Sequence, residues 1–170
     1  NDYEQLVKIC DENEIGVIKM EVVRNFGPEH NFLQKVRELA TKRGIVLIFD
    51  ECTSGFRETF GGIHKKYSVN PDMAMFGKTI GNGYALTAVV GIKEVMSSVE
   101  DTFISSTFWT ERIGPTAALK TLEVMENIKS WELITDIGLK IREGWSALFN
   151  NYRINFSLSG IPSLSSYSFE

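Results

Sequence analysis

An unbroken apolar run followed by two acids constrains this chain more than any other feature. Residues 45–49 read Ile-Val-Leu-Ile-Phe, and Asp50 and Glu51 come directly after them. A run of this kind, without alternation, is typical of a parallel strand that is buried on both faces. Ligands of parallel sheets bind beyond the carboxyl ends of the strands. The two acids therefore either cap the following loop or serve a ligand that needs negative charge, and their position leaves both interpretations open.

Strand-like and helix-like segments alternate along the rest of the chain. Apolar residues at helical spacing predict a helix near residues 32–43, which Gly44 would end. The other predicted segments are an N-terminal helix within residues 3–10, strands at 16–23, 73–76 and 87–90, helices at 115–128 and 131–149, and a strand at 166–170. This alternation predicts an α/β fold with a parallel sheet and right-handed crossovers.

Composition excludes several classes of protein. The chain has 170 residues, enough for one domain with a core, and a net charge of −4, which argues against nucleic acid as its main partner. No apolar run approaches the ~20 residues that a membrane helix needs, and the N-terminus lacks the pattern of a signal peptide. Cys10 and Cys52 follow no metal or disulfide spacing, which suits a cytoplasmic protein. The chain lacks an initial Met and stops inside a strand-like segment, so we expect a piece of a longer protein.

Lys78 lies between a short strand and a glycine-rich turn, in the stretch Phe-Gly-Lys-Thr-Ile-Gly-Asn-Gly at 76–83. Apolar surroundings favour the neutral amine that reacts with carbonyl groups, although most lysines on loops are simply exposed. A phosphate-binding P-loop is excluded, because Asp72 stands where that motif needs its first glycine. The glycines also lack the spacing of a dinucleotide-binding fingerprint.

A cluster of hydroxyl side chains at residues 105–110, Ser-Ser-Thr-Phe-Trp-Thr, precedes the helix predicted to begin near Pro115. Hydroxyls and free backbone N–H groups near the start of a helix suit a phosphate. Capping of the helix by the same side chains is an equally ordinary explanation.

Taken together, these features resemble one known family. The resemblance lies in the order and spacing of residues 47–57, Gly61-Gly62, 67–72, Gly77-Lys78 with the turn 81–83, and 106–108. This order is similar to that of class III pyridoxal-phosphate aminotransferases, most of all to the glutamate-1-semialdehyde aminomutase branch, from about Gly16 to the C-terminus. The resemblance implies part of a fold-type I large domain, with three αβα layers around a mostly parallel sheet. Residues 1–150 would be its central part, and residues 151–170 the truncated start of a small C-terminal domain.

The resemblance also implies a cofactor, pyridoxal 5′-phosphate (PLP), and a role for five residues. Asp50 would contact the pyridine nitrogen and Lys78 would form the internal aldimine. Thr107 would bind the cofactor phosphate from the neighbouring subunit of a homodimer. Cys52 would pack against the ring, where valine or isoleucine is commoner, and Thr53 would touch the phenolic oxygen. No metal is implied.

The activity implied is amino-group transfer between a small-molecule donor and acceptor through pyridoxamine phosphate. An aminomutase or a racemase of the same fold, and a non-catalytic α/β interaction module, remain alternatives. The chain departs from the family where Val22 follows Glu21 instead of proline, and where residues 110–114 replace a Gly-Asn-Pro turn. The family's N-terminal part is absent, so we expect this chain alone to be inactive.

Five further residues have ordinary explanations. His30 and His64 show no metal-ligand pattern and are predicted to be surface or loop residues. Arg57 would meet a substrate carboxylate or form a structural salt bridge. Trp131 and Trp145 fall on the apolar stripe of one helix and are predicted to be core or dimer contacts.

Overall fold

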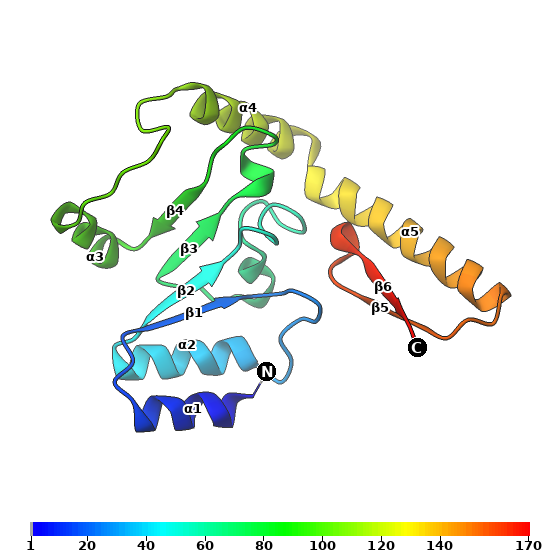
Figure 1. Cartoon of the computed structure of the whole chain (residues 1–170), viewed down its shortest axis with the longest axis horizontal. Coiled ribbons are helices and arrows are strands. Elements are labelled where there is room, and N and C mark those ends of the chain that lie inside the picture. Colours follow the sequence, from blue (N-terminus) through cyan, green and yellow to red (C-terminus); the bar gives the residue numbers. More distant parts are fainter. Residues whose placement is uncertain (1) are drawn as a thin grey trace.

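A four-stranded sheet forms the centre of the structure, a computed structural model that describes residues 2–170 (Figure 1). Its strands are β1 (Val17–Glu21), β2 (Val46–Asp50), β3 (Met73–Phe76) and β4 (Ala88–Gly91), in that spatial order. The first three are parallel to one another, and β4 runs antiparallel to β3. The predicted α/β fold with a mostly parallel sheet is therefore confirmed.

Helices α1 (Tyr3–Glu12) and α2 (Phe32–Arg43) cover one face of the sheet (Figure 1). The buried side of α2 packs against β2 in the main core, which includes Leu33, Leu47 and Phe49, all with no exposed surface. Gly44 ends α2 with a φ of 67°, a left-handed conformation that glycine adopts without steric cost. The predicted helix and its glycine stop are confirmed.

The chain from residue 130 onward extends away from the sheet (Figure 1), whereas residues 113–128 pack near it through Ala118, in a buried cluster with Phe56 and Ile80. Helix α3 (Lys93–Met96) follows β4 and leads through an exposed loop to α4 (Ile113–Ile128) and the long α5 (Ser130–Asn151). A two-stranded sheet, β5 (Phe156–Ser159) and β6 (Ser166–Phe169), packs against α5 through the ring of Phe149. Short 3-10 helices lie at Ile63–Tyr67, Lys78–Ile80, Ser97–Asp101 and Pro162–Leu164. Within residues 2–170, none of the helices has the length and apolar composition needed to cross a bilayer.

The antiparallel direction of β4 fits the mostly parallel sheet that the resemblance implied, but the alternation of strand-like and helix-like segments did not predict it. Its connection from β3, residues 77–87, contains a 3-10 turn and an irregular loop in place of a helix. Parallel pairing needs a crossover of about a dozen residues or more, usually helical. A short non-helical connection returns the chain beside β3, and antiparallel pairing follows.

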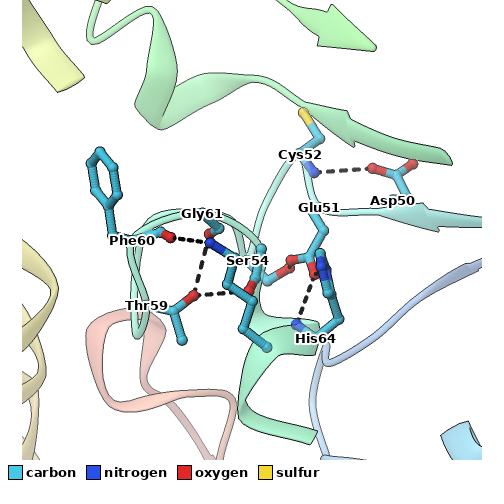
Figure 2. A network of polar contacts seen from close by, with 10 residues as sticks. Asp50, Glu51, Cys52, Ser54, Thr59, Phe60, Gly61 and His64 are labelled. Carbon is cyan, nitrogen blue, oxygen red and sulfur yellow. Dashed lines mark hydrogen bonds and ion pairs between the residues drawn. The ribbon is translucent and has the colours of Figure 1, made fainter. Parts of the chain in front are cut away.

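A buried carboxylate organises the loop that follows β2 (Figure 2). Glu51 has no exposed surface. Its Oε2 accepts a hydrogen bond of 2.5 Å from Ser54 Oγ, and its Oε1 accepts one of 3.0 Å from the backbone N–H of His64. The Nδ1 atom of His64 lies 2.9 Å from the same Oε1. Gly62 makes this approach possible, since a Cβ there would lie 2.3 Å from the His64 ring.

His64 was predicted to be a surface or loop residue, but it lies in the 3-10 helix Ile63–Tyr67 and is buried. It is only 8% exposed and serves as a partner of Glu51. Burial on its own raises the pKa of Glu51, but hydrogen bonds from His64 and Ser54 outweigh it and hold that pKa below its ordinary value. Glu51 is thus an ionised, fully bonded group that ties residues 51–64 into one loop.

Substitution of Leu33 tests the packing of the main core. Replacing Leu33 with alanine should lower the free energy of unfolding of the chain by about 2–5 kcal/mol, because a cavity would open at a fully buried position. Leu119→Ala is the matched control, since Leu119 is 71% exposed and its loss should change stability by about 0.5 kcal/mol or less. Urea denaturation measures both. Equal effects of the two substitutions would contradict the placement of α2.

Glu51→Gln tests the buried network. At pH 7 the substitution should cost about 1–3 kcal/mol, because Ser54 and His64 lose a charged acceptor. The folded-state pKa of Glu51 is depressed, so its contribution is complete above the ordinary value of 4.5 and disappears as the pH falls through the folded-state pKa. The difference between wild type and variant should therefore shrink below about pH 4.5. Denaturant titrations across this range measure it, and a difference independent of pH would count against an ionised Glu51.

Candidate active site

The ends of β2 and β3 bring together two segments that lie far apart in the sequence. Asp50 is the last residue of β2 and is in register with Met75 of β3. Lys78 follows β3 after Gly77, and a Cβ on Gly77 would lie 2.6 Å from Cys52 Sγ. The loop after β2 and the loop after β3 are thus in direct contact, and glycine is required at the point of closest approach.

Among the described residues, the side chain of Lys78 makes one hydrogen bond, from its Nζ to Thr53 Oγ1 at 2.6 Å. Its φ of 43° lies in the left-handed region, which costs a non-glycine residue of order 1 kcal/mol. The turn that starts here, with Asn82 N bonded to Lys78 O at 3.1 Å, holds this backbone in place. Lys78 is exposed, so the apolar surroundings that the sequence suggested are absent among residues 2–170. The hydrogen bond to Thr53 instead gives the Lys78 amine a defined direction.

Asp50 presents a carboxylate that is bonded at both oxygens. Oδ2 lies 2.9 Å from Lys19 Nζ, and Oδ1 accepts a hydrogen bond of 3.1 Å from the backbone N–H of Cys52, as Figure 2 shows. The hydrogen bond from Lys19 lowers the pKa of Asp50 most, and burial opposes it by raising that pKa. The Cys52 N–H and the charge of Lys78 lower the pKa further, and the net result is a pKa below the ordinary value. Asp50 is therefore ionised at neutral pH.

Sequence reasoning missed Lys19. The signal that could have identified it is a lysine between apolar residues of a predicted strand. A charged side chain among apolar ones is favourable mainly where an opposite charge lies on the same face of the sheet. Its partner, Asp50, belongs to the neighbouring strand, and only the register of β1 and β2 shows that the two side chains share a face.

Thr53 links Lys78 to a third residue, Arg57. Its hydroxyl accepts the bond from Lys78, and its carbonyl accepts one of 2.7 Å from Arg57 Nε. Among the described residues Arg57 has no acidic partner, so of the two predicted alternatives the structural salt bridge is not found, and a contact with a substrate carboxylate stays a prediction. Burial lowers the pKa of Arg57. Arg57 thus fixes the backbone that carries Thr53 and the bond to Lys78.

Thr107 lies apart from this group. It is exposed on the loop before α4, and within residues 2–170 it makes no hydrogen bond to the other predicted site residues. The start of α4 also differs from the expected phosphate site, because Glu111 accepts from the backbone N–H of Ile113 at 2.7 Å and of Gly114 at 3.4 Å. An acid already occupies the N–H groups that a phosphate would need.

His30 is exposed, as predicted. Trp131 and Trp145 both lie on α5 and are half-buried, with Trp131 against Phe60 and Trp145 against Tyr167. No cluster of three potential metal ligands occurs in the part of the chain that the structure describes. The structure therefore brings together an ionised carboxylate and a primary amine at one sheet edge, with a thiol and a hydroxyl between them.

Such a pair suits one kind of chemistry. A primary amine can bind an aldehyde covalently, and a carboxylate can hold the proton of a ring nitrogen. The two groups are close enough that the charge of Lys78 lowers the pKa of Asp50. A carbonyl-bearing aromatic ligand is thus the class of molecule that the two groups would hold between them.

Comparison with solved structures supports the fold. The chain superposes on an omega-transaminase from Sphaerobacter thermophilus with a TM-score of 0.90 at 25% identity, covering 99% of this chain and 41% of that one. It superposes on the PLP internal aldimine form of FumI from a Sphingopyxis species with a TM-score of 0.95 at 20% identity, covering 99% and 43%. The likeness to the second structure concerns the fold alone.

Comparison of sequences identifies relatives of known name. The chain is 34% identical to a 3-aminobutyryl-CoA aminotransferase of Cloacimonas acidaminovorans, over 95% of this chain and 41% of the relative. It is 33% identical to a glutamate-1-semialdehyde 2,1-aminomutase of Methanosphaera stadtmanae, over 99% and 42%. The chain thus spans about two fifths of the length of these relatives. The family description "Aminotransferase class-III" matches residues 4–157, nearly the whole chain, and the chain therefore belongs to the class-III aminotransferase family.

Proposed function

We propose that the protein containing this chain is a PLP-dependent aminotransferase, in which Lys78 binds the cofactor and Asp50 holds the proton of its ring nitrogen. The observation that carries the proposal is the placement of an ionised carboxylate and an amine at the ends of adjacent parallel strands. Membership of the class-III family supports it. Because the chain spans about two fifths of its relatives, the activity is proposed for the whole protein.

The residues present fit PLP. When bound, PLP supplies an aromatic ring that withdraws electrons from the substrate carbon that carries the amino group. Asp50 keeps lone pairs on both oxygens beyond those that its two bonds use, so it can accept from a protonated ring nitrogen. Lys78 Nζ is exposed and reachable, and Thr53 aims it. Cys52 is half-buried beside Gly77 and would contact the ring, and Thr53 Oγ1 would contact the phenolic oxygen.

Lys78 would have two roles. Its Nζ would hold the cofactor through the aldehyde carbon, with loss of water, and once a substrate amine has taken its place the free amine would take and return the proton of the substrate carbon. The bond to Thr53 limits the directions available to Nζ between these roles. A base held by one short hydrogen bond is positioned for proton transfer without a search through rotamers.

We further propose that Thr107 binds the cofactor phosphate of a neighbouring subunit in a homodimer. Thr107 is exposed, and its hydroxyl forms no hydrogen bond within the described residues. An active site shared between two copies would give this hydroxyl a partner. The two cysteines are free, in keeping with a proposed cytoplasmic location.

The substrates proposed are a small-molecule amino donor and acceptor. Residues 1–150 are proposed as part of the cofactor-binding domain and residues 151–170 as the start of a second one, and the separate sheet of β5 and β6 supports that division. An aminomutase, which returns the amino group to the same molecule, is the second candidate, because a relative with 33% identity bears that name.

Lys78→Ala tests the proposal in the full-length protein. The wild type, mixed with PLP, should show the absorption band of an amine–aldehyde adduct, and borohydride should fix the cofactor covalently to the peptide that contains Lys78. The variant should lose both signals. Lys93→Ala is the control, since Lys93 is also an exposed lysine and lies on α3. Labelling that persists in Lys78→Ala would overturn the assignment.

A second prediction concerns the 170-residue chain by itself. Thr107 and the exposed Lys78 depend on surfaces that this chain alone does not provide, so the site should be poorly organised. Loss of alignment costs about 100-fold or more in rate. Transamination between amino donors and 2-oxo acids should therefore stay at the level of PLP free in solution. Turnover clearly above that level by the purified chain would refute this prediction.

A further inference from the structure

Lys19 lies in β1, on the sheet face that also carries Asp50. In the β1–β2 register Lys19 is opposite Ile48, and Glu21 is opposite Asp50. Side chains two positions apart in a strand point to the same face, so Lys19, Glu21, Ile48 and Asp50 share one. The Lys19 side chain is 52% exposed and that of Asp50 22%. Lys19 thus reaches along the open face toward the strand end where the cofactor would bind.

Lys19 and the backbone of Cys52 together hold the Asp50 carboxylate in one orientation. Lys19 Nζ lies 2.9 Å from Oδ2, and the Cys52 N–H bonds Oδ1 at 3.1 Å. Two donors at different oxygens define the plane of the carboxylate. Since each oxygen has two lone pairs, each keeps one for a further donor. The geometry therefore leaves room for a ring N–H while one cation is already in place.

We propose that Lys19 is a positioning residue that orients the Asp50 carboxylate and weakens its hold on the proton of the cofactor's ring nitrogen. The inference rests on the proposed function, because it assumes that Asp50 faces this nitrogen. It goes beyond that function, because it assigns a second cation to the site and gives it an effect on the electronic state of the cofactor.

Two physical effects of Lys19 act in the same direction. The hydrogen bond from its ammonium group withdraws charge from the carboxylate, which is the largest cause of the low pKa of Asp50. Its positive charge would also repel the protonated ring nitrogen that binds the same carboxylate. Both effects favour loss of the ring proton, so Lys19 lowers the pKa of the ring nitrogen relative to a site with Asp50 alone.

The other ionisable groups around Asp50 do not replace this effect. Glu21 would oppose Lys19, but its Oε1 is paired with Arg24 Nη1 at 3.2 Å. Lys78 also lowers the pKa of Asp50 by its charge, although less than the hydrogen bond of Lys19 does. Cys52 contributes its backbone N–H. Lys19 is therefore the group whose removal changes the pKa of Asp50 most.

The experiment uses full-length protein loaded with PLP that carries ¹⁵N at the ring position. The ¹⁵N chemical shift reports the protonation of that nitrogen, and a pH titration gives its pKa. Lys19→Met and Lys19→Gln should raise this pKa by about one unit, since each removes an ion-pair partner of Asp50. Lys19→Arg keeps the charge and should stay close to wild type.

Lys8→Met is the matched control, because Lys8 forms an exposed ion pair with Glu12 on α1 and has no contact with Asp50. An unchanged ring-nitrogen pKa in both neutral variants of Lys19 would overturn the inference. So would an equal rise in Lys19→Arg, which would mean that shape rather than charge matters. A merely structural role of Lys19 would change stability and leave the ¹⁵N titration as it is in wild type.

Failure of the proposed function looks different. If Asp50 and Lys78 do not form the cofactor site, wild-type protein shows no adduct that depends on Lys78, whatever residue stands at position 19. Since Lys19 is half exposed, either neutral substitution should leave the fold intact. Circular dichroism confirms that before the titration.

Discussion

The parallel pairing of β2 with β3 is the interaction on which the candidate site depends. It places the carboxyl ends of two strands side by side, so that the residues after each strand meet although a long loop separates them. The contact is so tight that a Cβ at position 77 would lie 2.6 Å from Cys52 Sγ, and the thiol would have to move. Asp50 belongs to one strand end and Lys78 to the other. A shift of this register by one residue would turn Asp50 to the opposite face and separate the two groups.

The adjacent acids Asp50 and Glu51 show how a strand end can give two identical charges different tasks. Successive side chains of an extended backbone point in opposite directions. Asp50 faces the open side of the sheet, where Lys19 pairs with it and one lone pair on each oxygen stays available. Glu51 turns inward, where Ser54 and His64 bond it and no surface remains. The first acid can bind a ligand, whereas the second can only hold the loop.

Much of this architecture could be predicted from local sequence, whereas contacts between distant segments and the direction of β4 could not. The five-residue apolar run, the glycine after α2 and the residues 73–76 of β3 are each local signals, and each predicted element is present. The meeting of Asp50 and Lys78 at one sheet edge followed from the rule for parallel strands. The partners of those residues could not be predicted, because His64 reaches Glu51, and Lys19 reaches Asp50, only through tertiary contacts. The direction of β4 depended likewise on whether residues 77–87 form a helix.

The exposure of this sheet face determines how strongly the site's charges act. An ion pair that is open to water contributes little, because solvent screens both partners. In relatives that are more than twice as long as this chain, further residues are available to cover the face that carries Lys19, Asp50 and Lys78. Covering it would lower the local dielectric constant and strengthen every interaction among the three groups. The chemistry proposed here thus needs both the geometry that this chain supplies and a second surface that excludes water from it.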